Sequence, residues 1–169
     1  LFSAVLELWR AESDTLGFMP LGGFEQAARA GCLLAAVHPE RGFCGYILYR
    51  TTERKQTAIV HLCVAPAFRG YGVAKLLVES LKQRSGDSYE LRLRCRRDFR
   101  ANDLWSKLGF VPVADRPAKR KGALLTTWRY ELATLPLLRL AAENREEQAL
   151  RVVIDANVFL DLDERAAHH

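Results

Sequence analysis

The chain has 169 residues and a net charge of +5, and this length allows one ordinary domain with a hydrophobic core. Apolar residues make up 49% of it and charged residues 27%, as is usual in globular proteins. No apolar run approaches the roughly 20 residues that cross a bilayer, so we expect no membrane partner. The chain opens at Leu1 without the basic segment and cleavage site of a signal peptide, so we expect an internal start and a missing amino end.

The charge is divided unevenly along the chain. Residues 1–140 contain 22 Lys and Arg against 13 Asp and Glu, whereas residues 141–169 contain 3 against 7. The basic part predicts an anionic partner, either a polyphosphate cofactor or nucleic acid. The change of sign indicates that two different units meet near residue 140.

The four cysteines lie far apart and form neither a Cys-x-x-Cys pair nor a Cys/His cluster at zinc spacing. They are Cys32, Cys44, Cys63 and Cys95. We expect reduced, buried thiols, since a free cysteine packs as a small hydrophobic residue. This usage indicates a cytoplasmic protein and predicts no metal site within the chain.

The amino-terminal half predicts two helices followed by three strands. Amphipathic spacing predicts helices over residues 3–12 and 22–31, with a Gly/Pro-containing turn between them. Runs rich in β-branched, aromatic and aliphatic residues predict the strands, which cover residues 32–37, 43–51 and 57–64. Pro66 ends the third strand because proline has no backbone N–H for the ladder.

A glycine-containing turn and another helix follow. Val73, Leu77 and Leu81 recur at helical spacing and predict an amphipathic helix of about three turns. The later elements are a strand, a helix and two strands, over residues 89–95, 101–108, 110–114 and 124–132. Gly109 ends the second of these as a left-handed cap. The order of elements predicts a mixed α/β domain with largely hairpin-connected strands.

The turn between the third strand and its helix reads Arg69-Gly70-Tyr71-Gly72-Val73-Ala74. A helix amino terminus has unpaired N–H groups and a partial positive charge, which together favour an anion. Gly70 and Gly72 let the backbone approach that anion closely, and Arg69 adds a guanidinium. The pattern favours a phosphate site, with a plain tight turn as the alternative.

Two stretches carry longer motifs. In residues 62–77 a predicted strand ends in a hydrophobic residue and a proline. The pattern Arg/Gln-x-x-Gly-x-Gly/Ala follows, and a predicted helix comes after it. Residues 98–110 are similar to Asn-x-x-Ala-x-x-Leu-Tyr-x-Lys-x-Gly-Phe. Together they resemble the cofactor and downstream motifs of the GNAT superfamily over about residues 1–132. The resemblance implies the GNAT acyl-CoA N-acyltransferase fold, an α/β fold with a mixed, mostly antiparallel sheet flanked by helices. We expect this domain over residues 1–133, with a first strand missing before Leu1.

The resemblance implies acetyl-CoA as cofactor and an N-acetyltransferase acting on a primary amine of a small molecule or macromolecule. Backbone groups of Leu62, Cys63 and Val64 would hold the pantetheine arm. Main-chain N–H groups would hold the pyrophosphate, and the residues concerned are Arg69, Gly70, Tyr71, Gly72, Val73, Ala74 and Lys75. The amine is expected to attack the thioester directly.

Two positions depart from the family pattern and would lie near the cofactor. Trp105 stands where the family usually has a tyrosine that protonates the departing thiolate, and an indole can donate a hydrogen bond but no proton. Asp98 replaces the usual asparagine and brings a negative charge near the phosphates unless an arginine pairs with it. An alternative function is therefore a catalytically weak acyl-CoA-binding regulatory module.

His61 is the candidate general base, because imidazole titrates near neutrality and this residue lies on the expected cofactor strand. The alternative is a histidine that simply pairs with a neighbouring strand. No glutamate occupies residues 57–64, so no carboxylate base is evident on that strand.

Five arginines crowd residues 92–100. On a strand, Arg92, Arg94 and Arg96 would share one face. This face is either solvated or in contact with the 3′-phosphate of CoA. The other interpretation is a track for an RNA backbone, because phosphate contacts need only clustered cations.

The carboxyl-terminal part has a different character. Residues 134–150 are expected to form a helical linker. Residues 151–162 resemble the opening strand of a PIN-type ribonuclease domain, in which Asp155 would be a metal ligand once the domain is complete. We therefore expect residues 151–169 to begin a truncated PIN-like domain. The alternative module would regulate that domain, acting on RNA or aminoacyl-tRNA. The sequence identifies neither the acceptor nor the oligomeric state.

Overall fold

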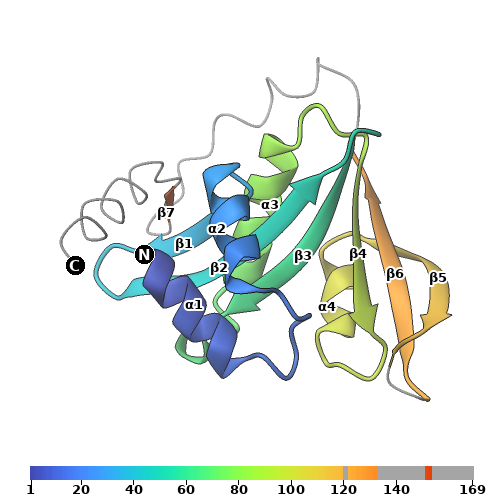
Figure 1. The fold of residues 1–169 in the computed structure, drawn as a ribbon, viewed down its shortest axis with the longest axis horizontal. Helices are drawn as coiled ribbons and strands as arrows, with labels where there is room; N and C mark the ends of the chain where they lie inside the picture. Colours follow the sequence, from blue (N-terminus) through green and yellow to red (C-terminus); the bar gives the residue numbers. More distant parts are fainter. Residues whose placement is uncertain (120–121, 133–150, 154–169) are drawn as a thin grey trace. The chain divides into compact units, whose positions relative to one another are not determined.

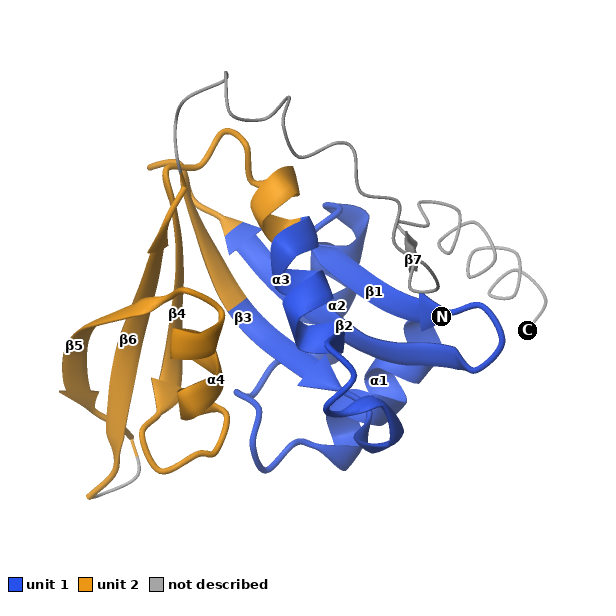
Figure 2. Cartoon of the chain, turned by 180° about the vertical axis from the view of Figure 1, so that it is seen from behind, with its two compact units in different colours: residues 1–50, 60–80, 149–169 blue, residues 51–59, 81–148 orange. Residues whose placement is uncertain are grey.

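The computed structural model describes residues 1–119, 122–132 and 151–153, and Figure 1 shows their fold. The chain divides into two units, which Figure 2 colours separately. Among the described residues, the first unit holds 1–50, 60–80 and 151–153, and the second holds the remainder. One long strand and one helix contribute residues to both units.

The first unit begins with two helices that pack on its sheet. Helix α1 (Phe2–Ala11) turns inward buried residues that recur every three positions, as an amphipathic helix does. Helix α2 (Leu21–Arg29) buries Phe24, whose ring centroid lies 5.0 Å from that of Trp9. One hydrophobic cluster joins both helices to the sheet, and its buried members are Phe2, Val5, Leu8, Phe24, Tyr46, Leu48 and Cys63.

The sheet of the first unit has the strand order β3-β2-β1-β7. β1 (Leu33–His38) and β2 (Gly42–Thr51) pair antiparallel with one bulge. β3 (Gln56–Val64) is the neighbour of β2. β7 (Arg151–Val153) pairs antiparallel with β1, so it satisfies backbone groups that would otherwise form an open sheet edge.

Helix α3 (Val73–Arg84) lies across the sheet face opposite to α1 and α2, as Figures 1 and 2 show from opposite sides. Its part in the first unit buries Val73, Leu77 and Val78. A short 3-10 helix, η1 (Pro66–Phe68), connects the end of β3 to the glycine turn that opens α3. The turn therefore follows directly from the strand end.

The sheet of the second unit has the order β5-β6-β4-β3. The first residues of β3 pair parallel with β4 (Glu90–Arg96). β6 (Leu124–Glu131) pairs antiparallel with both β4 and β5 (Val111–Pro117). The prolines of β5 fit its edge position, where a missing N–H removes no ladder bond.

Helix α4 (Asn102–Lys107) is tied to this sheet and ends at a glycine cap. Trp128 of β6 donates from Nε1 to Asn102 Oδ1 at 3.0 Å. Gly109 has a φ of 84°, and the next N–H reaches the Trp105 carbonyl at 3.0 Å, as in a Schellman cap. The left-handed cap predicted at Gly109 is confirmed.

The element order predicted from the sequence is confirmed, and so is the mixed, mostly antiparallel sheet flanked by helices. β5 continues to Pro117, beyond the strand predicted over 110–114, because its pairing with β6 extends that far. The described residues include only 151–153 of the strand predicted over 151–162. The linker predicted over 134–150 and the rest of that strand lie outside them.

None of the four cysteines forms a disulfide; Cys44, Cys63 and Cys95 are buried, as predicted, whereas Cys32 is half-buried. Within the ranges that the structure describes, no group of three or more His, Cys, Asp or Glu side chains gathers as a metal site would require. No helix in the same ranges is long and apolar enough to cross a bilayer.

Replacing Gly45 tests how closely β2 packs on the end of β3. A Cβ at Gly45 would lie 2.5 Å from the Cys63 carbonyl oxygen and 3.0 Å from Val64 Cα, both backbone atoms. We expect Gly45→Ala to lower the free energy of unfolding in urea by about 1–3 kcal/mol, because the backbone must shift.

The matched control is Gly22→Ala on helix α2, where a Cβ would meet nothing within 4 Å. This variant should gain up to about 1 kcal/mol, since alanine favours a helix over glycine. A Gly45→Ala variant as stable as the wild type would contradict the close packing.

Candidate functional site

The carboxyl end of β3 is held in place by β2. Burial alternates along β3, so Cys63 is buried while Leu62 and Val64 are half-buried. The N–H of Ala65 donates to the Cys44 carbonyl at 2.9 Å, just past the end of the strand. The three residues predicted to offer backbone groups to a pantetheine arm therefore lie together at the end of a strand next to β2.

The glycine turn leaves open space beside its backbone. Gly70 and Gly72 have φ values of 83° and 80°, in the left-handed region that favours glycine. A Cβ on either residue would meet nothing within 4 Å. The first N–H groups of α3 have no intrahelical partner and face the amino end of the helix. An open backbone lined with donors fits a pyrophosphate group, so residues 69–75 have the features that the predicted site requires.

The Arg69 side chain turns back from the turn toward the strand and α1. Its Nε donates to the Val64 carbonyl at 3.1 Å, and its Nη2 lies 2.6 Å from Glu12 Oε1. Glu12 directly follows the last residue of α1, so this ion pair joins the helix to the turn. Sequence reasoning missed Glu12, since no motif contains it and only the packing of α1 brings it to Arg69.

Cys63 is a protonated thiol beside this ion pair. Burial raises its pKa to about 12, with a further rise from Glu12 and an opposing effect of Arg69. A thiol with this pKa is a poor nucleophile at neutral pH, because the thiolate is the reactive form. Cys63 therefore contributes packing and backbone groups.

His61 bridges the sheet and the connection between α1 and α2. Its Nε2 lies 2.8 Å from the Gly17 carbonyl oxygen, and its Nδ1 lies 3.3 Å from the Tyr46 hydroxyl. Since a carbonyl only accepts, Nε2 carries a proton and the neutral ring accepts at Nδ1 from Tyr46. Both ring nitrogens are thus occupied, and 2% of the residue is exposed.

Burial lowers the pKa of His61, and the hydrogen bond to the Gly17 carbonyl offsets part of this shift. The ring is therefore neutral near pH 7. To accept a substrate proton at Nδ1, the ring would first have to lose the hydrogen bond from Tyr46. The general-base role stays a prediction, and the observed contacts are those of the alternative, a histidine paired with a neighbouring strand.

Asp98 lies in the second unit, just after β4, and pairs with Arg96. Arg96 Nε donates to Asp98 Oδ1 at 3.0 Å, and Nη2 donates to the other carboxylate oxygen. Such a two-pronged pair is among the stronger charged contacts in proteins. The arginine partner that the sequence analysis required for Asp98 is therefore present.

Trp105 is buried in the second unit, where its ring packs edge-on against Phe110 at 5.4 Å. Its buried Nε1 has no acceptor at hydrogen-bonding geometry within the described residues. The indole N–H lies near the Cys95 thiol. Burial raises the pKa of this thiol, and Trp105 offsets part of that rise. The polar atom of Trp105 is thus enclosed within its own unit.

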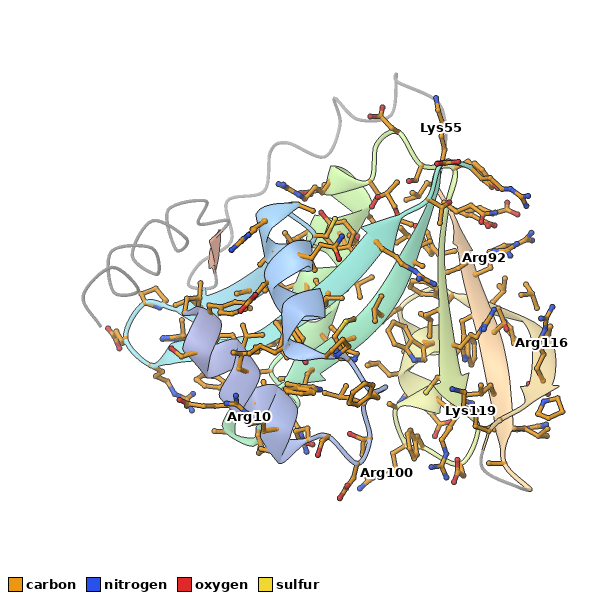
Figure 3. The ribbon with its side chains drawn as sticks, viewed as in Figure 1. Arg10, Lys55, Arg92, Arg100, Arg116 and Lys119 are labelled. Carbon is orange, nitrogen blue, oxygen red and sulfur yellow. The ribbon has the colours of Figure 1, made fainter. Side chains whose placement is uncertain are left out.

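Positive charge gathers in the described part of the second unit, with 13 Lys and Arg against 7 Asp and Glu. Figure 3 labels five of these cations, Lys55, Arg92, Arg100, Arg116 and Lys119. Along β4, Arg92 and Arg94 are exposed on one face, as predicted. Glu90, Asp98 and Asp115 pair with Arg92, Arg96 and Arg97. Carboxylates therefore neutralise much of the arginine run, and RNA binding stays a prediction.

The family model described as an acetyltransferase (GNAT) domain matches residues 25–132. No curated protein sequence matches the chain. The matched range contains both motifs and all the cofactor residues considered above.

Several solved structures have a similar fold. Nourseothricin acetyltransferase is 16% identical with a TM-score of 0.54, over 59% of this chain and 64% of that protein, so this chain spans less than two thirds of it. Ard1 from Thermoplasma volcanium is 18% identical with a TM-score of 0.66, over 78% of this chain and 93% of that one. The NatC complex bound to Gag peptide and CoA contains a chain with 18% identity and a TM-score of 0.66, over 78% and 90%. At these identities the likeness shows the fold, and it confirms the fold predicted from the two motifs.

The lowered pKa of His61 predicts how stability depends on pH. Because the folded-state pKa is below the unfolded value of about 6.5, the unfolded chain binds the proton more tightly. The stability gained from keeping His61 neutral is complete above the unfolded-state pKa. It declines as the pH falls toward the folded-state pKa. We expect the melting temperature of the wild type to fall from pH 7.5 to pH 5.5 by more than that of His61→Gln.

The glutamine variant keeps groups that can donate to Gly17 and accept from Tyr46, and effects of other titrating residues are common to both proteins. Equal falls in melting temperature for the two proteins would show that His61 is not the group responsible.

Proposed function

Since this chain belongs to the GNAT acetyltransferase family, we propose that it transfers an acetyl group from acetyl-CoA to a primary amine. The observation that carries the proposal is the glycine turn at the start of α3. Gly70 and Gly72 leave open space there beside the first N–H groups of the helix. This turn stands where the sequence resembles the cofactor motif.

The proposed cofactor residues are those predicted from the sequence. Backbone groups of residues 62–64 would hold the pantetheine arm, and main-chain N–H groups of residues 69–75 would hold the pyrophosphate. Asp98 and Trp105 stay proposed cofactor residues on the resemblance of the downstream motif. Bound acetyl-CoA would supply an acetyl group activated as a thioester.

Direct attack by the acceptor amine is the proposed course, since the protonated Cys63 offers no thiolate for an acyl-enzyme. The amine nitrogen forms a bond to the acetyl carbon, and the carbon–sulfur bond breaks with its electron pair on sulfur, releasing the CoA thiolate. The thiolate takes up a proton from solvent as it leaves, and the amine gives up one proton. His61 is the proposed acceptor of that proton. A second candidate is the carboxylate of Glu12, whose side chain is 21% exposed and which would receive the proton through water.

The proposed acceptors are peptide amino termini or small-molecule amines. The similarity to a chain of the NatC complex, which was solved bound to Gag peptide and CoA, supports testing peptides. The similarity to nourseothricin acetyltransferase supports testing nourseothricin. Four cysteines that form no disulfide suit a reducing compartment and support a proposed cytoplasmic location.

Titration calorimetry with CoA tests the cofactor site. Gly72→Glu should reduce binding below detection, because the side chain and its charge would enter the open space at the turn. Gly122→Glu is the matched control, since Gly122 has a φ of 82° and open space in the β5–β6 connection. It carries the same strain and charge and should keep CoA affinity within about twofold. Unchanged affinity in Gly72→Glu would remove the basis of the proposal.

Release of the free CoA thiol tests transfer. The amines offered would be a peptide with a free amino terminus, lysine and nourseothricin, with product mass confirming one added acetyl group. We expect release above the rate of hydrolysis with at least one of them. CoA binding without release for any amine would favour the alternative function.

That alternative is a catalytically weak acyl-CoA-binding module, and the buried Trp105 is the observation that favours it. The module would regulate a PIN-like domain, whose proposed ligand Asp155 lies outside the described residues. We expect Trp105→Tyr to raise turnover by supplying a phenol that can give up a proton, and Trp105→Phe to leave turnover nearly unchanged. A large loss in the phenylalanine variant would reveal a role for the indole N–H in turnover.

A further inference from the structure

A guanidinium from another part of the chain lies beside the glycine turn of residues 69–74. Arg69, the arginine of the motif, is already bound to the Val64 carbonyl and the Glu12 carboxylate. A second arginine, Arg41, reaches the same segment from the connection between β1 and β2. Arg69 thus directs its charge toward Glu12, and Arg41 brings a second positive charge to the turn.

The β1–β2 connection is built to present Arg41. The side chain of His38 accepts, at Nδ1, the backbone N–H groups of Glu40 and Arg41, both at 3.2 Å. Gly42 then returns the chain to β2 with a φ of 77°. These contacts hold the backbone of a short hairpin turn in one conformation, so the base of the Arg41 side chain starts from a defined position.

Aromatic rings orient the Arg41 guanidinium. Its central carbon lies 4.3 Å from the ring centroid of Phe68, a buried residue of η1. It also lies 5.9 Å from the ring centroid of Tyr71, which stands between the two glycines of the turn. Stacking on a ring face orients a guanidinium without using its N–H donors.

A guanidinium has five N–H groups. Among the residues that the structure describes, Arg41 makes one long contact, from Nη2 to the Ala67 carbonyl at 3.5 Å, so most of its donors have no acceptor there. No carboxylate of the described residues forms an ion pair with Arg41, and the residue is exposed. An exposed, oriented and unneutralised guanidinium beside open glycines is suited to a phosphate oxygen.

We propose that Arg41 binds the pyrophosphate of CoA at the glycine turn, which rests on the proposed function. Arg69 acts there as a structural arginine that ties the turn to β3 and α1. The cationic contact to the cofactor thus comes from a hairpin outside the motif. A purely structural role for Arg41, pinning Phe68 in place, would instead alter the stability of the turn and leave the charge dependence of binding unchanged.

Calorimetric titration of CoA into the full chain tests the proposal. Arg41→Gln should weaken binding by about fivefold or more, and Arg41→Lys should recover part of that loss, because it restores the charge without the fork. The dependence of affinity on salt should become shallower in Arg41→Gln, since one charge contact is lost. Arg10→Gln, on the exposed side of α1 (Figure 3), is the matched control and should bind as the wild type does.

Titration with 3′-dephospho-CoA, which keeps the pyrophosphate, identifies the phosphate concerned. The loss in Arg41→Gln should persist with this probe. A loss that disappears would place the contact on the 3′-phosphate and overturn the assignment, as would wild-type affinity for CoA in Arg41→Gln. An unchanged salt dependence alongside weaker binding would overturn it in favour of a structural role. If the wild type itself does not bind CoA, the proposed function fails, and this inference fails with it.

Discussion

The close packing of two backbones, β2 on β3, is the constraint on which the site depends. Glycine at position 45 allows β2 to approach the Cys63 carbonyl, where a methyl group would be placed at 2.5 Å. The hydrogen bond from Ala65 to Cys44 continues this pairing past the end of the strand. Because η1 and the glycine turn follow at once, the position of this strand end also sets where the N–H groups of α3 point.

Two polar contacts bring the α1–α2 connection to β3 and to the turn that follows it. Arg69 pairs with Glu12 at the start of the connection, and His61 bonds to the Gly17 carbonyl within it. The His61 ring is packed between aromatic neighbours, with Phe24 at 5.6 Å and Tyr46 at 6.2 Å. Burial favours its neutral form, so this contact is a pair of ordinary hydrogen bonds and needs no buried charge. Helices, strand and turn are thereby held as one arrangement within the first unit.

The arginines of this chain differ in the partners of their guanidinium groups, a difference that the sequence does not reveal. Arg96 neutralises Asp98, and Arg69 is directed inward to Glu12. Arg41 is stacked on Phe68, and most of its donors have no acceptor in the part of the chain that the structure describes. A net charge or a local run of cations therefore indicates an anionic partner in general. Which guanidinium contacts it depends on the carboxylates and rings that the fold places beside each one.

Local chemistry made much of this protein predictable from its sequence. Glycines that must adopt a positive φ, at positions 70, 72 and 109, made the tight turn before α3 and the helix cap predictable, because few other residues tolerate that conformation. Apolar periodicity placed the helices and strands, since burial of one face follows a spacing of two or of about 3.6 residues. The two family motifs were recognisable because each is a continuous stretch of sequence.

Contacts between distant segments were decided only by the tertiary structure. Nothing in the spacing of Glu12, Gly17 or Arg41 relates them to the turn or to His61, because their partners lie on other elements and meet them only when those elements pack. The edge pairing of residues 151–153 with β1 is of the same kind, since a short apolar strand can pair with many edges. The sequence by itself determined the elements and the glycine turn that opens α3. The packing of α1, β2 and β3 decided which charged and titratable groups surround that turn, because such contacts depend on geometry that local residue preferences do not encode.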